Sequence, residues 1–281
     1  MLLNELIALK KSAVKIRKGI LEAVYAAQSG HPGGSLSIAD LLAVLMDRMH
    51  IDPSRPDDPD RDRLVLSKGH AAPALYAALA QRGFFPETEL RRLRTMHGML
   101  QGHPDMHCTP GVDISTGSLG LGFSAAAGMA LYGQCMGSPY RVYCILGDGE
   151  LEEGIVWEAA AMSSRYALDH LTAFVDVNGL QIDGTTAQVL GGGREAERFL
   201  AFGWNVLEID GHDLKAIADA LKWAEDTKGR PGAVLLRTVK GKGISYMEDR
   251  VEWHGQAPNE AQYLKGITEL DQAWRALEAE V

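Results

Sequence analysis

Two short stretches, "GDGELEEG" (residues 147–154) and "DVNGLQIDG" (residues 176–184), place small oxygen-bearing side chains beside glycine. Each follows an apolar run, "VYCIL" and "LTAFV" respectively, so each marks the end of a predicted strand. Asp148 offers a carboxylate, Asn178 an amide oxygen and Leu180 a main-chain carbonyl. Mg2+ prefers oxygen ligands and takes few protein groups together with phosphate oxygens. If the two strands are neighbours, these three groups predict a magnesium site.

Glycines beside these ligands suit an anionic partner. Gly147, Gly149 and Gly179 leave room for a diphosphate to approach the backbone, and the amino end of a helix predicted over 151–166 adds a favourable dipole. Asp-Gly and Asn-Gly are also common turn dipeptides, so either stretch alone is more typical of an ordinary βα turn than of a functional site. The pair, at this spacing and at two strand ends, indicates a metal and diphosphate site.

The elements that must position these groups alternate along the chain. Strands are predicted at "RLVLS", "YRVYCIL", "LTAFVDV", "WNVLEID" and "AVLLRTV". Helices are predicted between most of them, at residues 71–83, 119–135, 151–166, 194–202 and 213–226. This alternation predicts an α/β fold, a parallel sheet with helices on both faces. Because ligands of such sheets bind outside the carboxyl ends of the strands, both stretches should share one crevice.

Helices also precede the sheet. One is predicted over residues 2–28 and ends at "SGHPGG", and a second over 37–49 has Ser37 as a candidate cap. Glu150 and Glu152 are expected at the start of the 151–166 helix, where acidic side chains complement the helix dipole.

Nothing in the sequence separates two domains. We find no internal repeat and no long linker, so residues 1–281 are expected to form a single domain. The helical region 1–60 and a last amphipathic helix over 260–280 are expected to belong to it.

The composition of the chain argues against some classes of binding partner. The 281 residues carry 28 Lys and Arg against 37 Asp and Glu, and the net charge of -9 argues against nucleic acid. No apolar run is long enough to span a membrane, and the amino terminus lacks the separate apolar core of a signal peptide. The three cysteines show no paired spacing, which argues against disulfides. We therefore expect a cytoplasmic protein without a membrane or nucleic-acid partner.

The order and spacing of the motifs resemble a known family. GDG followed, about thirty residues later, by an Asn-containing strand end resembles the thiamine diphosphate motif, and "GDGELEEGIVWEA" with "DVNGLQIDG" resembles transketolase. The resemblance covers about residues 10 to 256 and implies the thiamine-diphosphate-binding fold of the diphosphate (PP) type. Further matching strings are "SGHPGGSLS", "LVLSKGHAAPALYAAL", "QGHPD", "PGVDISTGSLGLG", "DGHD", "TVKGKGISYMED" and "WHG".

The resemblance assigns residues to the cofactors thiamine diphosphate and Mg2+. It implies Asp148, Asn178 and the Leu180 carbonyl as metal ligands. Residues expected at the cofactor are His70, Gly117, Ser118, Leu119, Asp148, Gly149, Asn178, Lys240 and His254. Two positions are open: Leu121 stands where many relatives have Gln, and Lys242 could replace Lys240 beside the diphosphate.

The resemblance also implies a transferase that moves a two-carbon glycolaldehyde unit from a ketose, or ketose phosphate, to an aldose. His31, His103 and His254 match family histidines that face the substrate channel, and imidazole can both donate and accept the protons that such chemistry moves.

A partner chain is expected as well. The sequence ends where the family's pyrimidine-binding domain would begin, so it resembles the N-terminal subunit of a split transketolase, active only with a C-terminal subunit that carries the activating glutamate. A heterotetramer is the expected assembly. Glu153 would face the subunit interface, and the 151–166 helix would bury Ala159, Ala160 and Ala161 near it.

Three other interpretations compete. His97, His103, His107 and Cys108 are of the types that bind zinc, although they lack the usual paired spacing. The chain could be the alpha subunit of a 2-oxo acid dehydrogenase, another thiamine-dependent enzyme. It could also be a non-catalytic binding or regulatory protein that kept the fold.

Overall fold

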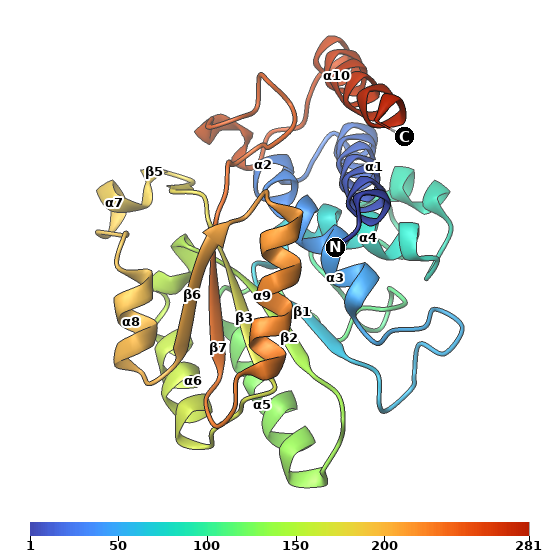
Figure 1. Cartoon of the computed structure of the whole chain (residues 1–281). Coiled ribbons are helices and arrows are strands. Elements are labelled where there is room, and N and C mark those ends of the chain that lie inside the picture. The colour runs from blue at the N-terminus through green and yellow to red at the C-terminus, as the bar shows by residue number, and fades with distance from the viewer. Residues whose placement is uncertain (281) are drawn as a thin grey trace.

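The computed structural model describes residues 1–280, and a five-stranded parallel sheet lies at its centre (Figure 1). The strand order is β1-β2-β3-β7-β6. The strands are β1 (Arg63–Leu66), β2 (Val142–Gly147), β3 (Leu171–Val177), β6 (Asn205–Asp210) and β7 (Gly232–Arg237). Every residue of β3 is buried, as expected for a parallel strand covered on both faces. The predicted α/β fold is confirmed.

Helices cover the two faces of the sheet in separate layers (Figure 1). One layer consists of α1 (Leu3–Ala27), α3 (Ala39–Arg48), α4 (Ala72–Arg82) and α9 (Leu214–Asp226). The other consists of α5 (Leu121–Met136), α6 (Gly154–Arg165) and α8 (Glu195–Ala201). Successive side chains of β2 point to opposite faces of the sheet. Tyr143 and Ile145 pack against the first helix layer, and Cys144 and Leu146 pack against the second.

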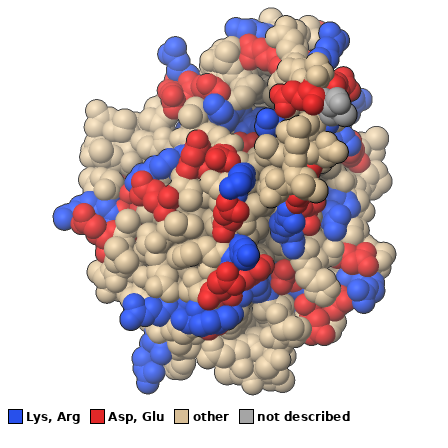
Figure 2. All heavy atoms as spheres, in the orientation of Figure 1, with Lys and Arg blue, Asp and Glu red and all other residues tan. Residues whose placement is uncertain are grey.

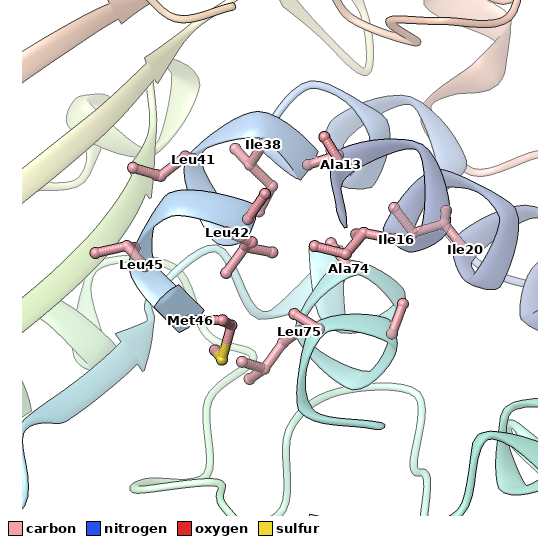
Figure 3. Packing of buried hydrophobic residues seen from close by; sticks show 14 of the residues in the cluster. Ala13, Ile16, Ile20, Ile38, Leu41, Leu42, Leu45, Met46, Ala74 and Leu75 are labelled. Carbon is pink, nitrogen blue, oxygen red and sulfur yellow. The ribbon is translucent and has the colours of Figure 1, made fainter. Parts of the chain in front are cut away.

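The amino-terminal helices pack through aliphatic side chains. Ile16 of α1, Leu42 of α3 and Leu75 of α4 meet in one cluster, shown in Figure 3. The predicted helix over 37–49 is wrong at its start, because α2 (Pro32–Leu36) comes before α3.

Ser37 does not cap α3, because the cap position belongs to Ile38, which makes no side-chain bond there. The hydroxyl of Ser37 points into the protein instead. Its Oγ lies 2.7 Å from Asp176 Oδ2, to which it donates its single proton, and 3.1 Å from the Gly34 carbonyl oxygen.

The last helix, α10 (Glu260–Ala279), lies along α1 (Figure 1). The ring of Tyr263 stacks on Tyr25 with centroids 4.1 Å apart, and Leu270 and Leu277 are buried. Asn259 caps the helix together with Gln262 in a capping box. The predicted helix over 260–280 therefore docks on the amino-terminal layer.

The segment after β2 differs from the prediction. A 3-10 turn covers Gly149–Glu152, and α6 begins only at Gly154. The predicted start at residue 151 is wrong, because a separate 3-10 turn that contains Glu150 comes before α6. A short antiparallel hairpin, β4 (Leu180–Gln181) with β5 (Gly184–Thr185), and α7 (Thr186–Val189) follow β3 and were not predicted.

The surface carries both signs of charge. On the face drawn in Figure 2, Lys and Arg side chains lie among Asp and Glu side chains rather than in one basic field. Among residues 1–280, no helix has both the length and the apolar character needed to cross a membrane.

Candidate active site

A cavity of about 290 Å³ opens at the carboxyl ends of the parallel strands, where the sequence predicts the crevice. The end of each of the four strands β1, β2, β3 and β7 supplies lining residues. Most residues expected at the site line it, namely His31, His70, Gly117, Leu119, Asp148, Gly149, Asn178, Leu180, Lys240 and His254.

The three expected metal ligands lie together, because β2 and β3 are adjacent and in parallel register. Asp148 Oδ1 accepts from the Gly149 amide (2.9 Å) and Oδ2 from the Gly179 amide (2.6 Å). Asn178 Oδ1 accepts from the Leu180 amide (3.1 Å). Burial and the nearby charge of Asp176 raise the pKa of Asp148 to about 6. A divalent cation would supply the positive charge that this buried carboxylate lacks.

The donor set fits the two groups implied by the motifs. A carboxylate, an amide oxygen and a carbonyl suit Mg2+, and the Lys240 ammonium beside them suits an anionic diphosphate. Lys240 Nζ lies 3.0 Å from the Leu180 carbonyl oxygen. That oxygen has two lone pairs, so it can accept from Lys240 and still face a cation.

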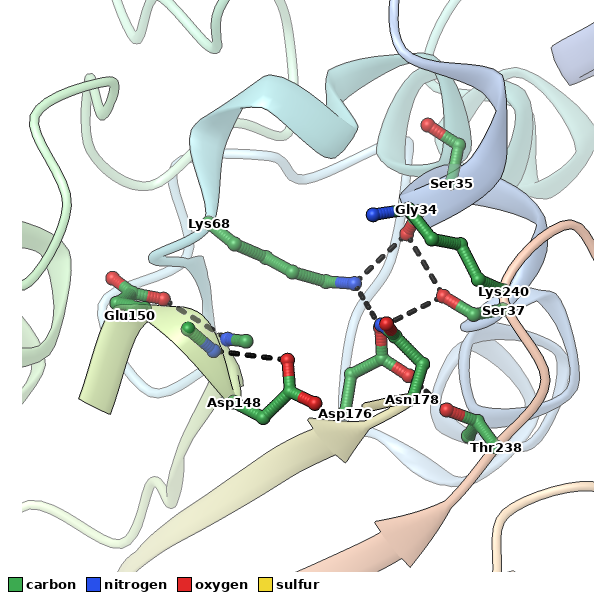
Figure 4. Close-up of polar contacts among 12 residues, drawn as sticks. Gly34, Ser35, Ser37, Lys68, Asp148, Glu150, Asp176, Asn178, Thr238 and Lys240 are labelled. Atoms are coloured by element: carbon green, nitrogen blue, oxygen red, sulfur yellow. Dashed lines mark hydrogen bonds and ion pairs between the residues drawn. The ribbon is translucent and has the colours of Figure 1, made fainter. Parts of the chain in front are cut away.

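A buried ion pair in the cavity lining, Lys68 with Asp176, was missed by the sequence analysis. Lys68 Nζ lies 2.6 Å from Asp176 Oδ2, and the two residues are 1% and 0% exposed (Figure 4). Burial opposes ionisation of Asp176, but Lys68 outweighs it and holds the pKa of this carboxyl below its usual value. Asp176 also accepts from the hydroxyls of Ser37 and Thr238. A lone Asp inside the apolar run "LTAFVDV" was the available signal, because a buried carboxylate needs partners.

Asp176 orients the ligand amide. Asn178 Nδ2 donates to Asp176 Oδ2 (2.8 Å), which fixes the nitrogen toward the protein interior and the oxygen Oδ1 on the other side. Lys68 Nζ also donates to the Gly34 carbonyl (2.8 Å), so the pair ties α2 to the strand ends.

Glu150 does not act as a helix-start residue. It is 2% exposed and accepts from Ser67 Oγ (2.5 Å) and from the amides of Gly120 (2.7 Å) and Gly147 (3.1 Å). Burial raises the pKa of this carboxyl. The side chain thus joins the ends of β1 and β2 to the start of α5. Glu152 Oε1 accepts from Gln181 Nε2 (3.1 Å), so it too serves a tertiary contact.

Three histidines from distant parts of the sequence, His31, His70 and His254, line the cavity, whereas His103 lies beside His31, is exposed and is not among the lining residues. The ring of His31 lies with its centroid 5.3 Å from His70, 5.4 Å from His254 and 6.5 Å from His103. The rings of His70 and His254 stack at 5.2 Å. Nδ1 of His31 is buried and has no hydrogen-bond partner among the described residues.

These imidazoles are held in the neutral form. Burial, with nearby positive groups, lowers the pKa of His31 and of His254 to about 4. Burial also lowers the pKa of His70 and of His103. A neutral imidazole carries one donor and one acceptor nitrogen, which is what proton transfer with a hydroxyl group requires.

The turn "TGSLG" lies only partly at the cavity. Gly117 and Leu119 line it, whereas Ser118 is not among the lining residues. Leu121 is 52% exposed at the start of α5. The side chain that departs from the family pattern is therefore not part of the cavity lining.

The two candidate lysines differ in burial and in their distance from the cavity lining. Lys240 is 2% exposed and lines the cavity, and burial, together with the charge of Lys68, lowers its pKa to about 8. Lys242 Nζ instead lies 3.6 Å from Glu248 Oε1 near the surface.

Of the four residues expected at the subunit interface, two are exposed and two are buried. Glu153 is exposed at the cap position of α6. Ala159 and Ala160 do not form an exposed small-residue face, because they pack inside the layer of α5, α6 and α8. Only Ala161 is exposed. The predicted three-alanine contact is wrong, since two of the methyl groups fill the chain's own core.

The zinc interpretation finds no support. His97 and His107 are exposed, Cys108 is an exposed free thiol, and His103 turns toward the other histidines. Within residues 1–280, no group of three or more His, Cys, Asp or Glu side chains is arranged to hold a metal ion.

Comparison with known proteins agrees with this geometry. Residues 9–274 match the family described as "Transketolase, thiamine diphosphate binding domain". The chain belongs to the transketolase family. Thiamine diphosphate is therefore the cofactor of this domain, as the sequence analysis expected.

Relatives within the transketolase family include proteins of similar length. The chain is 47% identical over 266 residues to the 6-deoxy-6-sulfo-D-fructose transketolase subunit SqwG of Clostridium sp. (strain MSTE9), covering 94% of this chain and 97% of that one. It is 38% identical over 273 residues to one of the subunits of the apulose-4-phosphate transketolase of Phocaeicola vulgatus (strain ATCC 8482), covering 97% of each.

Longer transketolases contain the same fold. The crystal structure of transketolase from Campylobacter jejuni superimposes with a TM-score of 0.90 at 30% identity, covering 99% of this chain and 46% of that one. The chain thus corresponds to whole subunits of two relatives and to less than half of a longer transketolase.

Proposed function

We propose that this chain is the diphosphate-binding subunit of a two-chain transketolase that transfers a glycolaldehyde unit from a ketose to an aldose. The observation that carries the proposal is the match, over 97% of their length, to two transketolase subunits. Those relatives are named for a sulfonated and a phosphorylated sugar. We therefore propose a donor with an anionic group at the end remote from its carbonyl carbon.

The proposed cofactor site consists of a set of metal ligands and a set of residues that would contact the cofactor directly. Thiamine diphosphate, when bound, supplies the carbanion chemistry, and the chain supplies orientation and electrostatics. Asp148, Asn178 and the Leu180 carbonyl would hold Mg2+. Contacts to the cofactor would come from His70, Gly117, Ser118, Leu119, Gly149, Lys240 and His254.

The proposed catalytic residues are His31, His103 and His254. Cleavage of a ketose between C2 and C3 requires a proton to leave a hydroxyl group, and the reverse reaction requires its return. Neutral imidazoles can accept such a proton and give it back. His31 is the strongest candidate, because it lines the cavity and its ring centroid lies 5.3 Å from that of His70 and 5.4 Å from that of His254.

We propose that the partner is a C-terminal transketolase subunit with the pyrimidine-binding domain and the activating glutamate. Glu153, exposed at the start of α6, would face it. The sixteen-residue helix α5 has no charged side chain, yet Leu121, Tyr132 and Met136 are 52%, 61% and 63% exposed. An uncharged helix with exposed apolar side chains is typical of a protein interface. Two copies of each subunit would form the heterotetramer.

We further propose that residues 1–281 form one domain and that the enzyme acts in the cytoplasm.

The decisive experiment is reconstitution. Purified chain with thiamine diphosphate and Mg2+ should show no ketose cleavage, and the partner subunit should restore it. Xylulose 5-phosphate and 6-deoxy-6-sulfo-D-fructose would be tested as donors beside pyruvate. Full turnover by this chain alone would refute the two-chain proposal, and turnover with pyruvate alone would indicate a 2-oxo acid enzyme.

A further inference from the structure

The motif "DGHD" lies outside the cavity lining, yet it contacts the loop that carries Lys240. This loop, residues 238–242, follows β7 and brings Lys240 to the cavity. Lys240 Nζ lies 3.0 Å from the Leu180 carbonyl oxygen and 3.0 Å from His254 Nδ1. The position of one ammonium group therefore affects a proposed metal ligand and a proposed catalytic histidine.

The loop is held on both sides of Lys240. The Val239 amide donates to Nε2 of His212, the histidine of "DGHD", at 2.8 Å. Arg17 Nε, from α1, donates to the Lys242 carbonyl at 3.0 Å.

Asp40 of α3 joins these two contacts. Its Oδ2 lies 2.8 Å from His212 Nδ1, and its two oxygens accept from the Arg17 guanidinium at 3.0 and 2.5 Å. Asp40 and Arg17 are each 6% exposed. Burial opposes ionisation of Asp40, but Arg17 and His212 outweigh it and hold the pKa of the carboxyl below its usual value.

The hydrogen bonds fix the tautomer of His212. Nε2 accepts from a backbone amide, so it carries no proton, and the proton of the neutral ring must be on Nδ1. Nδ1 can then donate to Asp40. The carboxylate thus determines which nitrogen faces the Val239 amide.

The backbone of the loop permits little movement. Gly241 has φ +80°, and a Cβ there would lie 2.3 Å from the Met247 carbonyl oxygen. Its amide donates to the Gly33 carbonyl (3.0 Å). A loop held at these points gives Lys240 one position.

We propose that Asp40, Arg17 and His212 are positioning residues that hold Lys240 at the cofactor site. We name these three residues the Asp40 clamp. It touches neither cofactor nor substrate, and it acts through Lys240 alone. The inference rests on the proposed role of Lys240 beside the diphosphate.

A double-mutant cycle tests the clamp in the reconstituted two-chain enzyme. Thiamine diphosphate affinity would be measured by calorimetry with Mg2+ for His212→Phe, Lys240→Met and the double variant. Residues within one hydrogen-bonded network couple, so His212→Phe should weaken binding about tenfold in the otherwise unchanged chain. With Lys240 already replaced, the same substitution should cost less than about twofold.

Asp213→Ala is the matched control in the same motif. Asp213 accepts from the amides of Lys215 and Ala216 at the start of α9 and does not contact the loop. Its loss should lower the melting temperature but leave the cofactor affinity unchanged. Arg17→Lys provides a second arm, because it keeps the charge beside Asp40 and removes the Nε donor to the Lys242 carbonyl. It should reproduce the loss of affinity, again only while Lys240 is present.

The outcomes are distinct. Equal loss of affinity from His212→Phe or Arg17→Lys with and without Lys240 would overturn the clamp and leave the proposed function intact. An unchanged affinity in Lys240→Met would overturn the role of Lys240 and the clamp with it. If His212→Phe does not fold, Arg17→Lys decides.

Discussion

Replacing Asp176 by Asn should destabilise the chain strongly, because it removes a charge without changing the size of the side chain. Lys68 would stay buried at 1% exposure with only neutral acceptors, the Gly34 carbonyl (2.8 Å) and the amide oxygen introduced at position 176. Ser37, Thr238 and Asn178 would lose an anionic acceptor at the same time.

The magnitude follows from the burial of the pair. Breaking a buried ion pair by removing one partner costs about 3–5 kcal/mol, whereas whole domains are stable by about 5–15 kcal/mol. We therefore expect Asp176→Asn to lower the free energy of unfolding by about 3 kcal/mol or more. The separate hydrogen bonds are not added to this figure, because groups in one network are not additive.

The assay is urea unfolding of the purified chain, followed by circular dichroism. Glu208→Gln is the control, because it breaks a pair with Arg237 in which both side chains are 46% exposed. Such surface pairs contribute about 0–1 kcal/mol. Lys68→Met combined with Asp176→Leu should be less damaging than Asp176→Asn, since it leaves no unpaired charge.

The pH dependence has a definite sign. The pKa of Asp176 is lower in the folded chain than its usual value, because Lys68 outweighs the effect of burial. Its contribution to stability is therefore full above the unfolded value, about 3.9, and is lost as the pH falls through the folded value. The difference between wild type and Asp176→Asn should shrink in acid. A loss below about 1 kcal/mol at neutral pH would refute the assignment of a strong buried pair.

The remaining predictions concern the cavity and the interface. Asp148→Ala should abolish Mg2+-dependent binding of thiamine diphosphate in calorimetry of the two-chain enzyme, and Asn178→Ala should weaken it less, because a neutral ligand is lost; unchanged affinity in Asp148→Ala would contradict the metal assignment. His31→Ala and His103→Ala should lower kcat or raise KM for the sugar with cofactor affinity nearly intact, and loss of the cofactor with retained sugar recognition would reverse these roles. Tyr132→Glu should weaken the binding of the two chains to each other in analytical ultracentrifugation, because it places a charge among the exposed apolar side chains of α5; an unchanged assembly would remove α5 from the interface.

Much of the fold was accessible from the sequence because buried parallel strands have a distinctive composition. "YRVYCIL" and "LTAFVDV" are largely apolar, since both faces of β2 and β3 are covered. Parallel strands end at one edge of a sheet, so the proximity of Asp148 and Asn178 was predicted on the condition that their strands are neighbours, and the sheet order confirms this condition.

What the sequence did not reveal depends on contacts between distant segments. Lys68 and Asp176 are 108 positions apart and pair only because β1, β2 and β3 are neighbours. Glu150 looks like an ordinary acidic helix start until Ser67 and Gly120 are placed beside it. Ser37 resembles a cap for the same reason, because a hydroxyl that serves a distant carboxylate has the same local sequence.

The neutral state of the clustered histidines bears on how a donor sugar is recognised. Uncharged imidazoles distinguish hydroxyl groups by their hydrogen bonds and respond little to a charge at the far end of a sugar. Under the proposed two-chain function, recognition of the donor's anionic end would therefore fall to residues outside this cluster, and a change of that end would be expected to leave these histidines unaltered.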